Sequence, residues 1–480
     1  MNSSAHEHNH NPNRFVVVPT NVRLNTHPSF TGRGVTIAFL DSGFFPHPDL
    51  IEPANRIIAY KDLADEKPTL VSGPNAQSWQ WHGTQTSVAA AGNGHLSGGV
   101  YQGIASKADL VLIKASEAGR ITEDNIARGI RWVIENKECH SIRILNISLG
   151  GDEDVPCSRS IIDQAAEEAV RQGIVVVVAA GNSGHEGKRS IPPANSPSVI
   201  TVGGYSDNNR VDKSKLDLYQ SNYGFTADGL LKPEIIAPAM WIAAPILPGT
   251  ADYRSAEALS RLAAAPDYEL PSLSRQLSAD AQLPASLIEA SSQTIRTFVE
   301  SLLKQRKIVA THYQHVDGTS FAAPIVSSIV AQMLEANPAL RPGAVKDILI
   351  STAERINGHS TLRQGYGVVN ARRAVEAATL ERHTVEGTSV AAVRDSLSFT
   401  YHNDTAETVT LAGDFNNWNA RQTPLSRQAS GLWRVEIPRP GPGRYQYKFV
   451  VNGRQWFEDP RNGLKAEDNF GGLNSVLFVE

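Results

Sequence analysis

The chain has 480 residues, which is enough for about three domains or for one large domain and a small one. Hydrophobic residues make up 41% and charged residues 20%, as in ordinary globular proteins, and a net charge of -4 without a long basic run argues against nucleic acid or an anionic membrane as the main partner. Two cysteines exclude a disulfide framework. Because no stretch resembles a signal peptide or a membrane span, we expect a cytoplasmic protein with reduced thiols.

Short apolar runs rich in β-branched residues recur through the first half of the chain, at 35–41, 110–116, 142–150, 174–182 and 198–204. Runs that are apolar on both faces are typical of strands buried in a parallel sheet. Apolar residues at helical spacing lie between some of these runs, as in 123–136. The alternation predicts an α/β fold with a parallel sheet and helices on both faces. Ligand chemistry in such sheets gathers at the carboxyl ends of the strands.

Residues about 250–310 interrupt this alternation. Over 284–305 the apolar residues keep the spacing of an amphipathic helix: Ile295, Phe298, Val299, Leu302 and Leu303. A shorter helical pattern precedes it, so we interpret the segment as a helical insertion. Three partners for its apolar face stay open, namely its own domain, a second subunit in an oligomer, and a lid surface over the site.

The character of the chain changes after about residue 380. From residue 397 onward, short alternating strands are separated by clusters of Gly, Pro, Asn and Asp, which predicts an all-β immunoglobulin-like sandwich. The expected divisions are an N-terminal extension at 1–32, the α/β domain at 33–378, a linker at 379–394 and the sandwich at 395–480.

Three short motifs carry the parts of an activated serine nucleophile. Asp41 directly follows the first predicted strand, His82 precedes a run of small residues, and Ser320 opens a predicted helix. In such a set the imidazole takes the hydroxyl proton, and the carboxylate holds the imidazole tautomer and stabilises its cation. Each motif alone fits a turn, a loop or a helix cap. Together, in the order Asp, His, Ser, they indicate a serine hydrolase.

Six motifs are spread over the α/β part of the chain: Asp41-Ser42-Gly43, His82-Gly83-Thr84, Ser148-Leu149-Gly150-Gly151, Ala179-Ala180-Gly181-Asn182, Gly318 to Pro324 and Gly365 to Asn370. In these motifs, residues about 33–378 resemble the subtilase family of serine peptidases. The resemblance implies a serine endopeptidase that acts on proteins or peptides through an acyl-enzyme. It implies that Asn182 donates to the oxyanion together with the backbone N–H of Ser320. It further implies that two segments flank the pocket for the residue before the scissile bond: Ser148, Leu149 and Gly150, and Ala179, Ala180 and Gly181.

The N-terminal part departs from the family pattern, and a candidate calcium ligand stays open. Only 40 residues precede Asp41, which leaves no room for a signal and a folded prodomain. The apolar stretch Phe15 to Pro19 fits a packing arm, and the alternative is an inhibitory strand lying along the cleft. Asp49 matches a position that binds calcium in some relatives but fits a turn cap equally well. No metal site is therefore predicted, and calcium at Asp49 stays an alternative.

The tail segment carries four groups of aromatic and polar residues: Gly413 to Trp418, Tyr447-Lys448-Phe449, Trp456 with Asp459-Pro460, and Asn474-Ser475-Val476. In these elements, residues about 395–480 resemble the carbohydrate-binding module of starch- and glycogen-acting enzymes and of the β subunit of AMP-activated protein kinase. The resemblance implies an α-glucan partner contacted by four residues: Trp418, Lys448, Trp456 and Asn474. A flat indole can cover the C–H face of a glucose ring while polar groups bind its hydroxyls. Both tryptophans are expected in loops, whereas Trp433 fits the core.

The combined prediction is a serine endopeptidase tethered to a glycogen- or starch-like α-glucan. The alternative is a peptidase-fold protein whose tail module makes protein–protein or intramolecular regulatory contacts instead. An inactive glycan-bound scaffold is a further hypothesis, against which the intact Asp, His and Ser set argues. A glycosidase is another, but no barrel pattern with a pair of candidate carboxylates is found.

Overall fold

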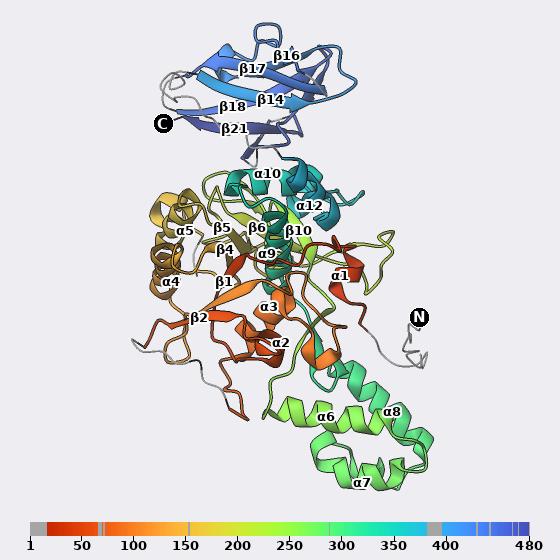
Figure 1. Ribbon diagram of the computed structural model, residues 1–480. Coiled ribbons are helices and arrows are strands. Elements are labelled where there is room, and N and C mark those ends of the chain that lie inside the picture. The colour runs from red at the N-terminus through yellow and green to blue at the C-terminus, as the bar shows by residue number, and fades with distance from the viewer. Residues whose placement is uncertain are drawn as a thin grey trace, which may run out of the picture.

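The computed structural model describes residues 17–65, 70, 73–151, 154–287, 289–381, 396–428, 431–440, 443–462, 464–468 and 470–479. An α/β domain carries a helical insertion at one end and a β-sandwich at the other (Figure 1). Among the described residues, no helix combines the length and the apolar character needed to cross a membrane. Cys139 and Cys157 are both free thiols.

An eight-stranded sheet forms the centre of the α/β domain. Across the sheet the order is β10 (Ile235–Pro238), β6 (Ile200–Ser206), β5 (Val175–Ala179), β4 (Ile142–Ile147), β1 (Thr36–Asp41), β3 (Asp109–Lys114) and β2 (Ile57–Asp62), and β7 (Asp217–Leu218) pairs antiparallel with β6. All pairs along the main path are parallel. The five strands predicted from apolar runs are β1, β3, β4, β5 and β6. The sequence patterns did not indicate β2, whose residues are mostly half-buried at the sheet edge, or the short β7 and β10.

Helices cover both faces of the sheet, as the alternation predicts. Side chains along β1 alternate between the faces, so that Ile37 and Phe39 join one apolar cluster while Ala38 and Leu40 join another. The first cluster includes α3 (Trp81–Ala91), α9 (Thr319–Ala336), α10 (Pro342–Thr352) and α12 (Ala371–Leu380), and the second includes α4 (Glu123–Asn136) and α5 (Ile161–Arg171). The remaining short elements are α1 (Thr20–Arg23), α2 (Pro48–Ile51), α11 (Thr361–Gln364), β8 (Gly224–Phe225) and β9 (Leu231–Lys232).

The insertion is a small helical unit with its own apolar core. It contains α6 (Ala251–Ala264), α7 (Leu270–Ala281) and α8 (Ser292–Gln305). Its base is an antiparallel sheet of β11 (Ile242–Pro245), β13 (Tyr313–Val316) and β12 (Ile308–Ala310). Ile295 and Val299 of α8 pack in one cluster with Leu259 of α6 and Leu277 of α7. The apolar face of α8 is therefore buried within the insertion itself. The sequence had left three partners open, and this one lies within the same domain.

The β-sandwich contains two antiparallel sheets. One holds β14 (Ser396–His402), β17 (Leu432–Pro438) and β16 (Ser426–Arg427), and the other holds β15 (Val409–Gly413), β18 (Gly443–Val451), β21 (Leu473–Val479) and β20 (Lys465–Glu467), with β19 (Gln455–Phe457) paired to β18. Phe449 and Trp433 lie in its core, as expected for Trp433. Apart from 379–381, of which α12 includes the first two, the linker expected at 379–394 lies outside the described residues.

Residues 458–462 of the sandwich contact the α/β domain directly. The Tyr366 hydroxyl donates to the Asn462 carbonyl oxygen at 2.5 Å. Two ion pairs flank this bond, Arg355 with Glu458 at 3.7 Å and Arg461 with Asp347 at 3.5 Å. The two parts of the chain are thus joined by specific contacts as well as by the linker.

The described part of the apolar N-terminal stretch is a packing arm. Val17 is buried and packs with Val309 and Tyr313 at the base of the insertion. Farther along, buried Arg23 forms an ion pair with Asp207 at 2.6 Å. Phe15 and Val16 lie outside the described residues, so an inhibitory role of that segment stays a prediction.

Candidate functional site

Asp41 and His82 form a hydrogen-bonded pair at the carboxyl end of the sheet. Asp41 is the last residue of β1, and His82 lies in the first turn of α3. The Nδ1 atom of His82 lies 2.7 Å from Oδ1 of Asp41, whose side chain is 1% exposed. The backbone N–H of Ser42 also donates to Oδ1, and the Thr86 hydroxyl donates to Oδ2 at 3.2 Å. Both oxygens of the Asp41 carboxylate therefore accept hydrogen bonds.

The charge on Asp41 acts directly on the imidazole. Burial by itself disfavours the imidazolium, but the charge of Asp41 and its hydrogen bond outweigh burial and raise the pKa of His82 above 6.5. Since Nδ1 donates to the carboxylate, Nε2 of the neutral ring is left as the proton acceptor. The imidazole of His82 is thus placed to accept a proton, and the Asp41 carboxylate stabilises the imidazolium that results.

Ser320 lies in the first turn of α9, next to this pair. Its side chain is half-buried, and the ring of the following Phe321 lies 6.0 Å from the ring of His82. The Ser148 hydroxyl donates to the carbonyl oxygen of Ser320 at 2.9 Å. Gly318, directly before the helix, has a φ of 142°, a conformation that is strained for residues with a side chain. The N-terminal end of α9 thus presents a hydroxyl where the helix dipole favours negative charge.

Asn182 follows β5 and is oriented by Thr319. Its Oδ1 accepts from the Thr319 N–H at 2.8 Å and from the Thr319 hydroxyl at 3.0 Å. The same hydroxyl accepts from the Gly181 N–H at 3.1 Å. Because Oδ1 takes both Thr319 donors, the amide nitrogen is left for another acceptor, and both ends of the amide lie close to Gly318. The sequence motifs identified Asn182 as a candidate residue, but they did not indicate that hydrogen bonds from Thr319 orient its side chain.

The two segments expected to flank a peptide pocket are the extensions of β4 and β5. Ser148 to Gly150 follow β4, while Ala179 ends β5 and Ala180 and Gly181 follow it. A third segment, which sequence reasoning missed, lies against the first: the Pro192 carbonyl accepts from the Gly151 N–H at 2.8 Å. A Cβ atom added at Gly150 would lie 3.3 Å from Ile191. Ile191 therefore borders the floor of this region.

A charged pair links the insertion to the residues before Ser320. Lys307, which follows α8, forms an ion pair with Asp317. Asp317 also accepts from the Trp241 N–H at 3.1 Å. Burial alone would raise the pKa of Asp317, but hydrogen bonds from His315, Lys307 and the Trp241 backbone lower it to about 2. This ion pair thus links the insertion to Asp317, three residues before the candidate nucleophile Ser320.

Asp49, the candidate calcium ligand, is fully buried and bound by protein donors. Its Oδ2 accepts from the Tyr313 hydroxyl at 2.6 Å, and its Oδ1 accepts from the Leu96 N–H at 3.0 Å. In the described part of the chain, no group of three or more His, Cys, Asp or Glu residues is arranged to hold a metal ion. The described contacts of Asp49 are those of a structural carboxylate.

The four residues expected to contact glycan line one hollow of about 600 Å³ in the β-sandwich. They are Trp418, Lys448, Trp456 and Asn474, and the hollow is completed by Asp414, Gln446, Glu467, Asp468 and Phe470. The two indole rings lie 6.4 Å apart with 34° between their planes. Trp456 lies on strand β19, so the expectation of a loop was wrong there, because the short hairpin with β18 left no alternating pattern.

Polar contacts fix the rim of this hollow. Asp414 accepts from the Trp418 indole N–H at 2.8 Å and from the Gln446 N–H at 2.6 Å, which orients the Trp418 ring. Lys448 forms an ion pair with Asp468 at 2.5 Å. Phe470 is 94% exposed and was missed by sequence reasoning. Its exposure at the edge of the hollow marks it as a third aromatic surface.

Comparison with known proteins agrees with both halves of this description. Residues 32–367 match the subtilase family, and residues 387–462 match carbohydrate-binding module 48, the isoamylase N-terminal domain. Serine protease AprX of Bacillus subtilis (strain 168) is 31% identical over 359 residues, which cover 72% of this chain and 67% of AprX. The major intracellular serine protease of the same organism is 34% identical over 184 residues, covering 36% of this chain and 52% of that protein.

A solved protease structure from Pseudoalteromonas arctica PAMC 21717 has the same fold, with a TM-score of 0.50 at 22% identity over 75% of this chain and 94% of that chain. The parallel sheet with helices on both faces, the order of the Asp, His and Ser motifs and these matches all point to the same family. The chain therefore belongs to the subtilase family of serine proteases and carries a carbohydrate-binding module of the isoamylase N-terminal type.

Proposed function

We propose that this protein is an endopeptidase with Asp41, His82 and Ser320 as its catalytic triad, and that its module tethers it to a neutral α-glucan. The single observation that carries the peptidase half is the hydrogen bond between buried Asp41 and half-buried His82 near the N-terminal end of α9, which begins at Thr319. The observation that carries the tethering half is the hollow that gathers all four expected glycan residues.

In the proposed reaction, Oγ of Ser320 attacks the carbonyl carbon of the peptide bond while Nε2 of His82 takes the hydroxyl proton. The oxyanion of the tetrahedral intermediate accepts hydrogen bonds from Asn182 and from the Ser320 N–H. His82 then gives the proton to the leaving amine as the C–N bond breaks, which leaves an acyl-enzyme. Water, deprotonated by His82, attacks the acyl carbon, and the proton returns to Ser320 as the acid product leaves.

The chemistry of the hollow favours a sugar without charge. Lys448 is already paired with Asp468, while Asp414 and Glu467 add carboxylates, so acceptors for hydroxyl groups outnumber unpaired cations at the rim. Two indoles and Phe470 supply flat apolar surface for C–H faces. Holding the peptidase near polysaccharide raises its effective concentration at glycan-associated proteins without new catalytic contacts.

The alternative role of the module, contacts with protein, is favoured by one observation. Residues 458–462 of the module contact Asp347, Arg355 and Tyr366 of the peptidase domain. The module therefore has an intramolecular surface, but that surface uses different residues from the hollow. Both roles can operate in one chain.

Two assays on the full chain test the proposal. A fluorophosphonate probe should label the wild type and not Ser320→Ala, and only the wild type should cleave casein. Glycogen–agarose should retain both proteins equally, since Ser320 takes no part in glycan binding. Labelling of Ser320→Ala would contradict the nucleophile, and failure of both proteins to bind glycogen would contradict the tether.

A further inference from the structure

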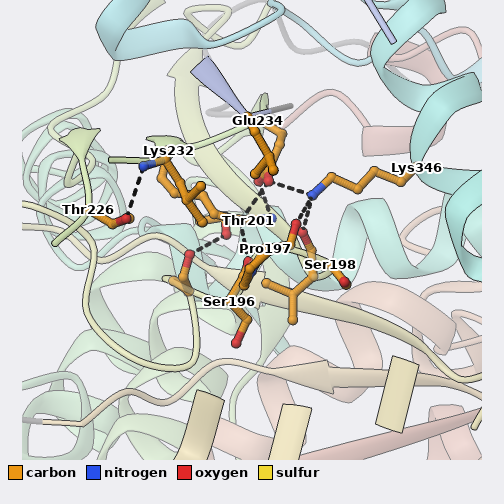
Figure 2. Close-up of polar contacts among 12 residues, drawn as sticks. Ser196, Pro197, Ser198, Thr201, Thr226, Lys232, Glu234 and Lys346 are labelled. Atoms are coloured by element: carbon orange, nitrogen blue, oxygen red, sulfur yellow. Dashed lines mark hydrogen bonds and ion pairs between the residues drawn. The ribbon is translucent and has the colours of Figure 1, made fainter. Parts of the chain in front are cut away.

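A largely buried cluster of three charged side chains has no place in the proposed reaction (Figure 2). It consists of Lys232 at the end of β9, Glu234 before β10, and Lys346 on α10. Oε1 of Glu234 accepts from the ammonium groups of Lys232 at 2.6 Å and of Lys346 at 2.7 Å. The side chains of Lys232 and Glu234 are 1% and 3% exposed.

Four hydrogen bonds of this Lys232–Glu234–Lys346 cluster go to one backbone segment, 196–201 (Figure 2). The bonds are Lys232 Nζ to the Ser196 carbonyl at 2.7 Å, Lys346 Nζ to the Pro197 carbonyl at 2.7 Å and to the Val199 carbonyl at 2.8 Å, and the Thr201 N–H to Oε2 of Glu234 at 2.8 Å. Three side chains therefore fix four main-chain groups within six residues. Charge-assisted bonds of this kind are stronger than neutral ones and more demanding in geometry.

The chain on either side of this fixed segment reaches both walls of the pocket. Toward the N-terminus, the Pro192 carbonyl binds the Gly151 N–H of the first wall, and Ile191 lies against Gly150. Toward the C-terminus, β6 pairs with β5, with Val202 opposite Ala179 of the second wall. The Ala180 N–H donates to the Val202 carbonyl at 3.0 Å. The cluster thus holds the middle of a segment whose two ends touch the two walls.

Stability alone is a weak reason for charges at this place. Burying ions costs several kcal/mol per ion, and well-packed apolar residues of the same volume are often equally stabilising. Burial alone would raise the pKa of Glu234, but the two lysines hold it below its ordinary value, so the carboxylate stays charged at neutral pH. A charged cluster does what apolar packing cannot, because it sets the positions of individual carbonyl and N–H groups.

We propose that Lys232, Glu234 and Lys346 are positioning residues for the peptide pocket. By fixing segment 196–201 they hold the walls at 148–151 and 179–181 at the spacing that seats a substrate side chain in register with Ser320. The proposal rests on the proposed peptidase function of that site. Its consequence is that the cluster acts on peptide binding while leaving the intrinsic reactivity of Ser320 unchanged.

The test uses Lys346→Met, Lys346→Arg and a control, Arg143→Met, in the full chain. Arg143 is matched to Lys346, since it also donates to two backbone carbonyls, those of Pro338 and Leu340, but it lies at the opposite end of β4 from Ser148. Two rates are compared for each variant. One is kcat/KM, with KM and kcat resolved, on peptides that fill the pocket. The other is the labelling rate with a small fluorophosphonate that does not need the pocket.

For Lys346→Met we expect kcat/KM to fall by about tenfold to a hundredfold, mainly through KM, because misplacing a binding group by about 1 Å has effects of that size. The labelling rate should stay within about twofold of the wild type, since the triad is untouched. Lys346→Arg should recover most of the loss, and Arg143→Met should show none. If Lys346→Met does not fold, Glu234→Gln, which keeps an acceptor for the Thr201 N–H, is measured in its place.

Two results would overturn the proposal: an equal loss of peptide turnover and labelling in Lys346→Met, or a KM effect in Arg143→Met as large as that in Lys346→Met. Either would reduce the cluster to a general stabilising role. A wild type that labels poorly and does not cleave peptides would instead contradict the proposed function of Ser320, so the two failures are distinguishable.

Discussion

Asn182 and Thr319 are joined by two hydrogen bonds that both end on the amide oxygen of Asn182, at 2.8 and 3.0 Å. Residues 137 positions apart in the chain thereby fix one amide at the N-terminal end of α9. The bonds leave the amide nitrogen free to donate, and the amide lies close to Gly318, which has no side chain. A donor that is already oriented needs no reorganisation when negative charge develops.

Replacing this donor should slow the chemical step. We expect Asn182→Leu to lower kcat by about 10²–10³, equivalent to about 2.7–4 kcal/mol of barrier, with little change in KM, because the donor acts on the oxyanion and not on the ground state. Thr319→Val, which keeps the Asn182 amide but removes the hydroxyl that holds it, should have a smaller effect of the same kind. Steady-state kinetics on a chromogenic peptide measure both. A loss confined to KM would contradict the oxyanion role.

Activity should rise with pH through the raised pKa of His82. The neutral imidazole is the proton acceptor, so the acid limb of kcat/KM is expected above pH 6.5. Stability should change in the opposite direction. Because the folded pKa is raised above the unfolded value, the Asp41–His82 pair contributes stability that is fully present below pH 6.5 and is lost as pH rises through the folded pKa.

The pH profile of fluorophosphonate labelling of the wild type checks the predicted rise of activity with pH. Urea unfolding of Ser320→Ala at several pH values checks the predicted fall of stability. Asp41→Asn should lower the midpoint of the acid limb and reduce kcat by about 10⁴, since the imidazole loses both its charge partner and its tautomer. An acid limb below pH 6.5 in the wild type would show that Asp41 does not raise the pKa of His82.

Glycan retention should depend on the exposed aromatic residues of the hollow. Trp418→Ala and Trp456→Ala are each expected to weaken binding to glycogen by about tenfold or more, equivalent to about 1.4 kcal/mol. Phe470→Ala should weaken it less, because Phe470 lies at the edge. The control is Phe457→Ala, since Phe457 is also exposed and follows Trp456 directly but does not line the hollow. Affinity electrophoresis in glycogen gels measures all four. Equal migration of Trp418→Ala and Phe457→Ala would remove Trp418 from the site.

Acid stability should depend on the ion pair between the insertion and the residues before Ser320. The folded pKa of Asp317 is about 2 against 3.8 in its ordinary state, so its contribution is present above pH 3.8 and is lost as pH falls toward 2. Lys307→Met should raise that pKa and make the loss of stability over this interval smaller. Denaturant unfolding from pH 5 downward in an inactive Ser320→Ala background measures it. Lys304→Met, an exposed lysine of α8, is the control and should match the parent.

Docking of the module should depend on Tyr366. Tyr366→Phe removes the donor to the half-buried Asn462 carbonyl and is expected to weaken docking by about 0.5–1.5 kcal/mol, the usual net contribution of a hydrogen bond. Arg461→Ala, which removes a partly exposed ion pair, should cost about 1 kcal/mol or less. Calorimetry that resolves the module transition measures both. A larger effect of Arg461→Ala than of Tyr366→Phe would reverse this ranking.

Sequence pattern was sufficient for the parallel sheet and for the kinds of residue at its site. Strands buried on both faces are apolar at most positions, so β1, β3, β4, β5 and β6 were visible as runs. Because parallel strands end at the same edge, ligand chemistry was expected at the carboxyl ends of the strands, and the structure brings Asp41 at the end of β1 to His82 of α3 there. The roles of these residues stay predictions. Edge strand β2 and hairpin strand β19 were missed because their residues are largely exposed or half-buried and follow no clear pattern.

By itself, then, the sequence determined the α/β and β-sandwich classes, the order of the motifs and the core position of Trp433, since burial dictates residue type locally. Only the tertiary structure decided the orientation of Asn182 by Thr319, the internal partner of α8, and the gathering of Asp414 and Phe470 around the two indoles. The tertiary structure also brings together the charged cluster, in which Lys346 binds Glu234 and Pro197, 112 and 149 residues away in the sequence. Such contacts depend on which distant backbone groups come within about 3 Å of a side chain, and no local periodicity records that distance.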